Sequence, residues 1–196
     1  MVGTILAGGK SRRFGRNKSM ERFQGERLIE RQVRTLRSLF PEVMIVTNRP
    51  ELYLDLDVTI VQDIIPGMGP LGGIYTGLLF AQGGSIFVTA VDMPFIQPAV
   101  IRRMLEVFPG HDVVIPRLGD YLEPLHGMYS PRCLTSVKRM LDREELQVVR
   151  FFPSVKAAYL DEEEIRRLDP EGLSFFNINT PGDMAQAMEI LGSQRE

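Results

Sequence analysis

The segment between Leu6 and Lys18 carries the most recognisable chemistry in this 196-residue chain. It holds five cationic side chains and three glycines, and no carboxylate occurs before Glu21. Glycines let backbone amides come close to a ligand, and consecutive N–H groups can form an anion-binding nest. Arginine and lysine add charge-assisted hydrogen bonds to phosphate. The segment therefore predicts a loop that binds a nucleoside triphosphate; the alternative is a glycine turn with solvated charges.

Two familiar nucleotide-binding motifs are missing from the same segment. Gly9-Lys10-Ser11 ends like a Walker A motif, but that motif needs a glycine at position 4, where this chain has Thr4. The Gly-x-Gly-x-x-Gly dinucleotide fingerprint is also absent. These departures argue against a P-loop kinase or NTPase and against an NAD- or FAD-binding protein.

Carboxylates follow two apolar runs further along the chain. Asp92 comes directly after residues 86–91, and Asp63 comes shortly after residues 58–61. Residues that follow buried parallel strands lie at the ligand edge of a sheet. Nucleotidyl transfer needs a hard cation, and Mg²⁺ is typically held by one or two carboxylates together with the phosphates of the substrate. We therefore expect Asp92 to bind Mg²⁺; the alternative is an N-cap for the helix after Pro94.

Short apolar runs alternate with helical patterns over the first part of the chain. Strands are predicted at 2–7, 43–47, 58–61, 86–91 and 113–115, and helices at 28–40, 71–81 and 99–108. This alternation predicts an α/β fold with a doubly wound, mostly parallel sheet and helices on both faces. After residue 116 the pattern changes, and a strand pair or edge strand over 121–130 gives the sheet one antiparallel edge.

The last third of the chain is predicted to continue the alternation. The expected elements are a helix at 131–141, a helix near 146–152, a strand at 155–160, an acidic helix from Asp161, a strand at 175–176 and a final helix from Pro181. No repeat or linker interrupts the chain. Its length then predicts one domain over residues 1–196.

Composition excludes several classes of protein. The chain has 23 basic and 25 acidic residues, and a net charge of -2 leaves no broad basic surface for a nucleic-acid backbone. With the single cysteine Cys133 no intramolecular disulfide can form. The first residues lack a basic leader region, and no run of 18 apolar residues occurs. We expect a cytoplasmic protein that binds neither nucleic acid nor a membrane.

The amino-terminal motif also carries a family resemblance. Leu-Ala-Gly-Gly-x-Ser-x-Arg-Phe-Gly, closed by Asn17-Lys18, resembles the signature of nucleotidyltransferases of the molybdenum cofactor guanylyltransferase type, also called molybdopterin-guanine dinucleotide synthase A protein. Later segments at 69–74, 91–95, 123–125 with 129–130, and 177–181 resemble that family's motifs at similar spacing. The resemblance covers almost the whole chain and implies a Rossmann-like nucleotidyltransferase fold. Many relatives have Cys where this chain has Val91.

The resemblance implies a reaction and a set of residues that perform it. The terminal phosphate of the molybdenum-molybdopterin cofactor attacks the α-phosphorus of GTP, GMP is transferred, and pyrophosphate leaves. The implied catalytic residues are Arg13, Lys18 and Asp92, the last also the ligand of Mg²⁺. The implied nucleotide-binding residues are Leu6, Ala7, Gly8, Gly9, Lys18, Asp63 and Asp92.

Several implied roles have simpler alternatives in the residues themselves. Asp63 either contacts the ribose or the metal shell or forms an ordinary turn. Asn177 and Asn179 lie beside the pterin substrate or the metal, or Asn179 or Thr180 caps the last helix. His126, beside Glu123, is a candidate for the lining of the second-substrate pocket. The glycines at 67, 69, 72 and 73 allow the backbone to approach the base or ribose, and helix packing is an alternative explanation for Gly72 and Gly73.

Related functions remain as alternatives. A cytidylyltransferase for the same cofactor or a sugar-phosphate nucleotidyltransferase has a similar first motif, and a non-catalytic nucleotide-binding adaptor represents a different class. Leu-Ala-Gly-Gly favours the guanylyl branch, because cytidylyl relatives tend to read Ala-Ala-Gly. Sugar-activating relatives often carry additional carboxyl-terminal domains, whereas this chain ends shortly after Pro181. GTP and molybdopterin are the expected partners, and the family alone implies molybdenum-enzyme chaperones or other cofactor-synthesis proteins.

Overall fold

A computed structural model describes residues 1–8, 20–23 and 25–193. Most of the predicted phosphate-binding loop, with Gly9, Arg13 and Lys18, lies outside the described residues. The prediction that the chain forms one domain stays a prediction. Within the described ranges, no helix combines the length and apolar character of a membrane span.

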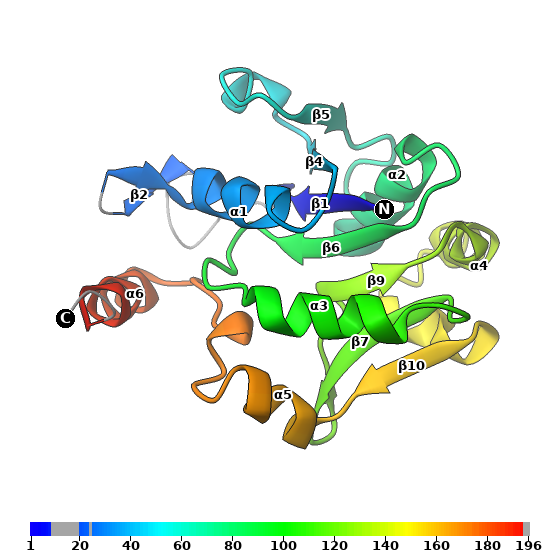
Figure 1. Cartoon of the computed structure of the whole chain (residues 1–196). Coiled ribbons are helices and arrows are strands. Elements are labelled where there is room, and N and C mark those ends of the chain that lie inside the picture. The colour runs from blue at the N-terminus through cyan, green and yellow to red at the C-terminus, as the bar shows by residue number, and fades with distance from the viewer. Residues whose placement is uncertain (9–19, 24, 194–196) are drawn as a thin grey trace.

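A twisted sheet forms the centre of the molecule (Figure 1). Among the described residues it has eight strands, seven of them in the order β10-β7-β9-β6-β1-β4-β5, with β8 paired to β7. The strands are β1 (Val2–Leu6), β4 (Glu42–Thr47), β5 (Thr59–Gln62), β6 (Ile86–Ala90), β7 (Val113–Leu118), β8 (Tyr121–Leu122), β9 (His126–Tyr129) and β10 (Ala157–Leu160). A separate hairpin joins β2 (Arg22–Phe23) to β3 (Glu26–Arg27).

The strand directions confirm the predicted fold class. β1 is parallel to both β4 and β6, and β10 is parallel to β7. The antiparallel part after residue 116 is also present, as β8 and β9. The structure adds that β9 lies inside the sheet, antiparallel to β6 on one side and to β7 on the other.

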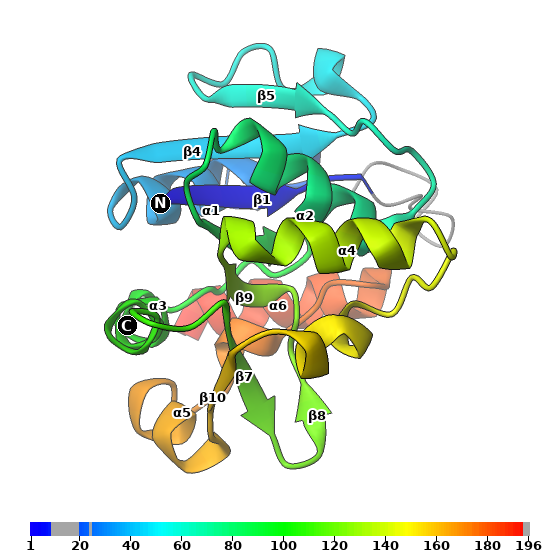
Figure 2. The ribbon, with the colours of Figure 1, turned by 90° about the vertical axis from the view of Figure 1, so that its right-hand side faces the viewer.

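Helices cover both faces of the sheet (Figures 1 and 2). The α-helices are α1 (Leu28–Arg37), α2 (Gly69–Phe80), α3 (Pro98–Val107), α4 (Leu134–Leu141), α5 (Glu162–Leu168) and α6 (Pro181–Ser193). The 3₁₀ helices are η2 (Pro50–Leu52), η3 (Pro131–Cys133), η4 (Val148–Ser154) and η5 (Leu173–Phe175). One face packs against α1, α3 and α5, and the other against α2, α4 and η4.

The two-residue period of the strands explains the two cores. In β1, Val2 belongs to the core under α2 and α4, whereas Ile5 belongs to the core under α1 and α3. Between them, Gly3 has no room for a side chain, because a Cβ there would lie 2.8 Å from the ring of Phe40. With both faces covered, only the strand ends are available to a ligand.

A third apolar cluster brings the carboxyl-terminal helix to the sheet edge. Ile178 and Met184 pack with Leu28 from α1 and with Phe95, which follows β6. The segment that contains Ile178 and α6 therefore lies near the start of α1 and near the residues after β6, although both are far from it in sequence.

One predicted element is wrong. The apolar pair at 175–176 predicts a strand, but Phe175 ends the 3₁₀ helix η5. The buried carboxylate of Asp169 accepts the N–H groups of Leu173 (3.1 Å) and Ser174 (2.7 Å), which stabilises a helical turn at this point. The other predicted strands and helices occur with ends shifted by a few residues, and the helix near 146–152 is the 3₁₀ helix η4.

Candidate active site

The carboxyl ends of neighbouring parallel strands meet at one edge of the sheet, where the arrowheads of β1, β4 and β5 point the same way in Figure 2. The N–H of Asp63 donates to the carbonyl of Thr47 (3.0 Å), and the N–H of Val91 donates to the carbonyl of Leu6 (3.1 Å). These bonds bring the start of the glycine loop, Asp63 and Asp92 to one edge, as the sequence predicts.

The first strand ends in a short segment that β4 holds in place. The N–H of Ala7 donates to Val46 (2.9 Å), and its carbonyl accepts the hydroxyl of Thr47 (3.1 Å). Both backbone groups of Ala7 are thus used within the protein. Gly8 is exposed, and a Cβ on it would lie 3.5 Å from the side-chain nitrogen of Asn48. Among the described residues no partner is found for the Gly8 amide, which makes it the first amide open to a ligand.

Asp63 is buried and forms the turn that leads from β5 to α2. Its Oδ1 accepts the hydroxyl of Thr76 (2.9 Å) and the N–H of Ile65 (3.2 Å). The turn role is therefore confirmed, and one carboxylate oxygen fulfils it. In the part of the chain that the structure describes, Oδ2 accepts no hydrogen bond. Asp63 can thus hold its turn and still offer an oxygen to a ligand.

The paired glycines of α2 serve helix packing. A Cβ on Gly73 would lie 2.9 Å from the side chain of Leu6, and a Cβ on Gly72 would lie 3.1 Å from the carbonyl oxygen of Ile65. The simpler of the two explanations is therefore confirmed at these positions. Close packing brings the start of α2 against the end of β1.

Asp92 is half-buried in the turn after β6. The side-chain amide of Gln32 donates to the carbonyls of Ala90 (2.7 Å) and Met93 (2.8 Å), on either side of Asp92. The carbonyl of Asp92 itself accepts the N–H of Ile178 (2.9 Å). Two segments distant in sequence thus fix the backbone that carries this carboxylate.

The alternative role of Asp92 as a helix cap is wrong. The helix after Pro94 begins at Pro98, and Gln97 occupies its N-cap position. Asp92 therefore lies several residues before the helix and remains at the sheet edge.

Gln32 is a positioning residue that sequence reasoning missed. It lies on α1, is fully buried, and its side-chain oxygen has no hydrogen-bond partner among the described residues. Its neighbour Arg31 donates to the carbonyl of Pro94 (3.2 Å), so that α1 holds the Asp92 turn at three carbonyls. A signal was present, because Gln32 is a polar residue on the apolar stripe that Ile29, Val33 and Leu36 define.

The two asparagines lie in the segment that reaches the Asp92 turn through Ile178. Asn177 is half-buried and donates to the carbonyl of Phe175 (3.1 Å), and Asn179 is exposed. The capping role belongs to Thr180 and Asp183, whose side chains and N–H groups pair reciprocally at 3.1 and 2.7 Å. Asn177 and Asn179 thus flank a backbone bond to Asp92.

His126 lies below the surface rather than in a pocket lining. It is fully buried, and its ring packs edge-on against Phe87 (5.1 Å) and Phe175 (5.4 Å). Neither ring nitrogen has a partner among the described residues, and burial lowers the pKa of His126 to about 3. The imidazole is therefore neutral and belongs to the core, while its neighbour Glu123 is half-buried.

The donor set at this edge suits a hard divalent cation that a substrate helps to bind. Asp92 follows β6 and Asp63 follows β5, three strands away in the same sheet, so that Mg²⁺ would take one of these carboxylates together with substrate phosphates. In the described part of the chain, no three His, Cys, Asp or Glu side chains gather as a metal cluster. A cation here depends on oxygens from a ligand.

Comparison with known proteins identifies the enzyme family. Residues 3–158 match the model of the MobA-like NTP transferase domain. The chain is 39% identical to a probable molybdenum cofactor guanylyltransferase of Pelotomaculum thermopropionicum, over 99% of this chain and 95% of the relative. The chain belongs to the MobA-like NTP transferase family. Its membership makes the protein a nucleotidyltransferase, an enzyme class that uses a divalent metal ion, and sets aside a non-catalytic adaptor.

Two further relatives match over nearly their full length. A molybdenum cofactor guanylyltransferase of Desulfosudis oleivorans is 35% identical, with 100% of this chain and 98% of the relative covered. The crystal structure of molybdopterin-guanine dinucleotide biosynthesis protein A from Archaeoglobus fulgidus has a TM-score of 0.86 and 30% identity, covering 98% of this chain and 100% of the other. The family resemblance and the nucleotidyltransferase fold are thus confirmed.

Proposed function

We propose that this protein transfers GMP from GTP to the terminal phosphate of the molybdenum-molybdopterin cofactor and releases pyrophosphate. The observation that carries the proposal is the position of Gly8, Asp63 and Asp92 along one sheet edge, in a chain whose full-length relatives are named molybdenum cofactor guanylyltransferases. The guanine dinucleotide form of the cofactor is the product.

The nucleotide binds on the β1, β4 and β5 side of the edge. Leu6 and Ala7 shape its start, and the amides of Gly8 and Gly9 bind the base and phosphates. The spare oxygen of Asp63 contacts the ribose or the metal shell. Arg13 and Lys18 neutralise the triphosphate, and this charge neutralisation, together with positioning, supplies most of the rate.

Asp92 separates the nucleotide from the acceptor. A divalent cation, which we propose to be Mg²⁺, would be held by Asp92 and the substrate phosphates and would neutralise charge on the α-phosphoryl group and the leaving pyrophosphate. The attacking phosphate is already ionised at neutral pH, so no side chain needs to act as a general base. The fixed turn around Asp92 keeps its carboxylate at the reacting centre.

The acceptor binds on the far side of Asp92, near Asn177 and Asn179. Their backbone connection to Asp92 through Ile178 supports this assignment. An association with molybdenum-enzyme chaperones or other cofactor-synthesis proteins, and a cytoplasmic location, remain predictions.

The decisive experiment offers the purified protein each of the four nucleoside triphosphates with Mg²⁺ and molybdopterin, and measures pyrophosphate release. We expect turnover with GTP. A preference for CTP would favour the cytidylyl alternative, turnover only with a sugar phosphate would favour the sugar-activating one, and no turnover with any triphosphate would contradict the proposal.

A further inference from the structure

The turn formed by residues 123–126 lies at the ligand edge of the sheet. It is on the side of β6 that faces away from β1, β4 and β5. His126 begins β9 opposite Thr89 of β6, and the N–H of Glu123 donates to the carbonyl of Pro116 near the end of β7 (3.1 Å). Strand β9 separates β6 from β7, and neighbouring strands lie about 4.8 Å apart, so β7 runs roughly 10 Å from β6. An extended acceptor bound at Asp92 can reach this turn.

The turn is held rigidly from several directions. Its closing bond joins the N–H of His126 to the carbonyl of Glu123 (3.1 Å), and the hydroxyl of Tyr129 donates to the carbonyl of Pro124 (2.6 Å). Leu125 packs against the cores on both faces of the sheet. Such support keeps a binding side chain in place before the ligand arrives.

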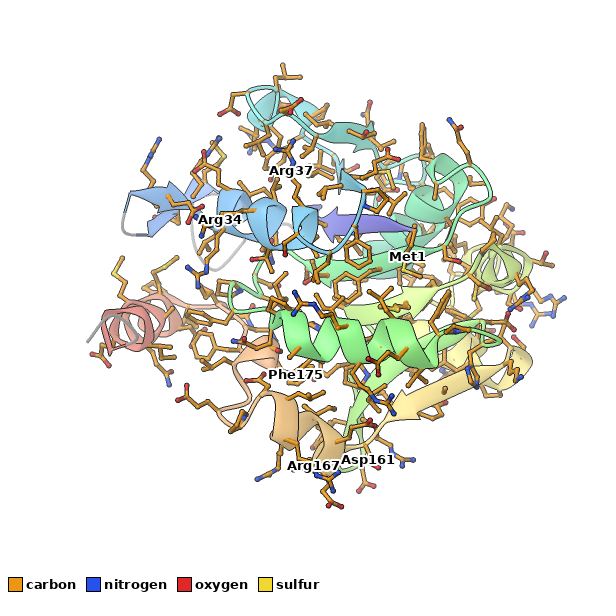
Figure 3. The ribbon with its side chains drawn as sticks, in the orientation of Figure 1. Met1, Arg34, Arg37, Asp161, Arg167 and Phe175 are labelled. Carbon is orange, nitrogen blue, oxygen red and sulfur yellow. The ribbon has the colours of Figure 1, made fainter. Side chains whose placement is uncertain are left out.

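Phe175 connects this turn to the Asp92 turn. Its ring contacts the ring of His126, and it lies on η5, in the segment that leads towards α6 (Figure 3). Its carbonyl accepts the amide of Asn177, and the next residue, Ile178, donates to Asp92. The turn that carries Glu123 and the turn that carries Asp92 are thus connected through the packing of Phe175.

Glu123 is the unsatisfied group on this surface. Its carboxylate is half-buried, and in the part of the chain that the structure describes it makes no ion pair and no side-chain hydrogen bond. Burial raises its pKa. Glu162, which lies close to the β7–β8 turn, is by contrast paired with Arg166. A partly desolvated carboxylate without a donor is unfavourable unless a ligand supplies one.

We propose that Glu123 binds the pterin end of the acceptor substrate. The 2-amino group and the N3–H of a pterin form two adjacent donors on one edge of the ring, a fork that matches the two oxygens of a carboxylate. This inference rests on the proposed function, because it names the acceptor of that reaction. Glu123 then recognises the aminopyrimidinone ring of the acceptor, and Asp92 acts at its phosphate.

The first test compares wild type with Glu123→Gln, Glu123→Asp and the control Asp120→Asn, whose exposed side chain lies in the adjacent β7–β8 turn. At saturating GTP we expect Glu123→Gln to raise the KM for molybdopterin about 10- to 100-fold, with kcat changed by less than about threefold. The Kd for GTP stays at the wild-type value, which also shows that the variant is folded. Glu123→Asp recovers part of the loss, and Asp120→Asn loses nothing.

A second test needs no variant. Pterin-6-carboxylate and lumazine-6-carboxylate differ in that the second has an oxygen in place of the 2-amino group. We expect the pterin to inhibit the wild-type enzyme at least about 10-fold more strongly, because the lumazine keeps N3–H but lacks the 2-amino donor, one of the two that face Glu123.

The outcomes separate this inference from the proposed function. Wild-type turnover with molybdopterin, together with an unchanged KM in Glu123→Gln, would overturn the role of Glu123 alone. Equal inhibition by the two rings, or no inhibition by either up to millimolar concentration, would do the same. A wild-type protein that does not use molybdopterin would overturn the proposed function and the role of Glu123 with it.

Discussion

The two halves of the ligand edge are built in different ways. On the nucleotide side, the site residues that the structure describes lie at strand ends, as Gly8 does shortly after β1 and Asp63 directly after β5. On the acceptor side, the surface is assembled from segments far apart in the chain, namely the Asp92 turn, residues 123–126 and residues 175–179. One half is a set of strand ends, and the other exists only when the whole chain is folded.

The two halves also differ in the charge they offer. The nucleotide side adjoins a segment with five cations and no acid, which suits phosphate oxygens. The acceptor side presents Glu123, a carboxylate without an ion pair among the described residues, close to the neutral, buried His126, which suits N–H donors. Asp92 lies between them, where we propose that the phosphates of both substrates meet.

The largest effect on activity is expected for a substitution of Asp92, which lies between the two halves. Asp92→Ala should reduce kcat about 100- to 1,000-fold, because both substrates lose the carboxylate that organises their phosphates. The free energy of unfolding should change by less than about 1 kcal/mol, since the side chain is only half-buried. Pyrophosphate release and denaturant unfolding measure the two effects. An active Asp92→Ala enzyme would contradict the proposal that Asp92 organises the phosphates of both substrates.

The next effect tests the nucleotide half alone. Lys18→Met should lower kcat/KM for GTP by about 10- to 100-fold, because a charge-assisted bond to phosphate is lost. The KM for molybdopterin should remain unchanged, and Lys10→Met, a change in the same segment at a residue without an assigned role, should have a smaller effect. Steady-state kinetics with each substrate varied in turn gives both values. If Lys18→Met impairs the use of GTP and of molybdopterin to the same extent, the two halves do not bind their substrates independently.

A third prediction concerns the core below the acceptor half. The pKa of His126 is about 3 in the folded protein and about 6.5 in the unfolded chain, so only the unfolded chain takes up a proton between these values. Stability contributed by the neutral ring is complete above pH 6.5 and is lost as the pH falls, by about 1.4 kcal/mol per unit.

The measurement is urea unfolding of wild type and His126→Leu at several pH values. Relative to pH 7, wild type should lose about 2 kcal/mol more than the variant by pH 5. If the free energies of unfolding of the two proteins change in parallel with pH, His126 is hydrated or paired. The core below the acceptor half would then not be a purely apolar environment.

The smallest effect tests how the Asp92 turn is held. Gln32→Leu removes two hydrogen bonds to the turn and should reduce kcat about 10-fold, with a loss of about 1 kcal/mol in stability. The Mg²⁺ concentration for half-maximal rate should rise, which a purely structural residue would not cause. The control is Arg34→Ala on the exposed side of α1 (Figure 3), where an ion pair with Glu26 contributes little. Unchanged Mg²⁺ dependence in Gln32→Leu would contradict the positioning role.

Much of the fold was predictable because local patterns specify it. The apolar runs at β1, β4, β5, β6 and β7 and the helical patterns of α1, α2 and α3 each correspond to observed elements. The strand predicted at 175–176 failed because Asp169, a few residues earlier, caps a helical turn there. Apolar content alone cannot reveal that hydrogen bond.

The sequence by itself determined the order of elements, the chemistry of the glycine loop and the strand ends that carry Asp63 and Asp92. These features depend on residue types and short spacings along the chain. Only the tertiary structure decided that Gln32 and Ile178 hold the Asp92 turn, that His126 is buried, and that Glu123 has no ion-pair partner within the described ranges. The physical reason is that burial and hydrogen bonding here join residues tens of positions apart, and no local spacing records which of them meet.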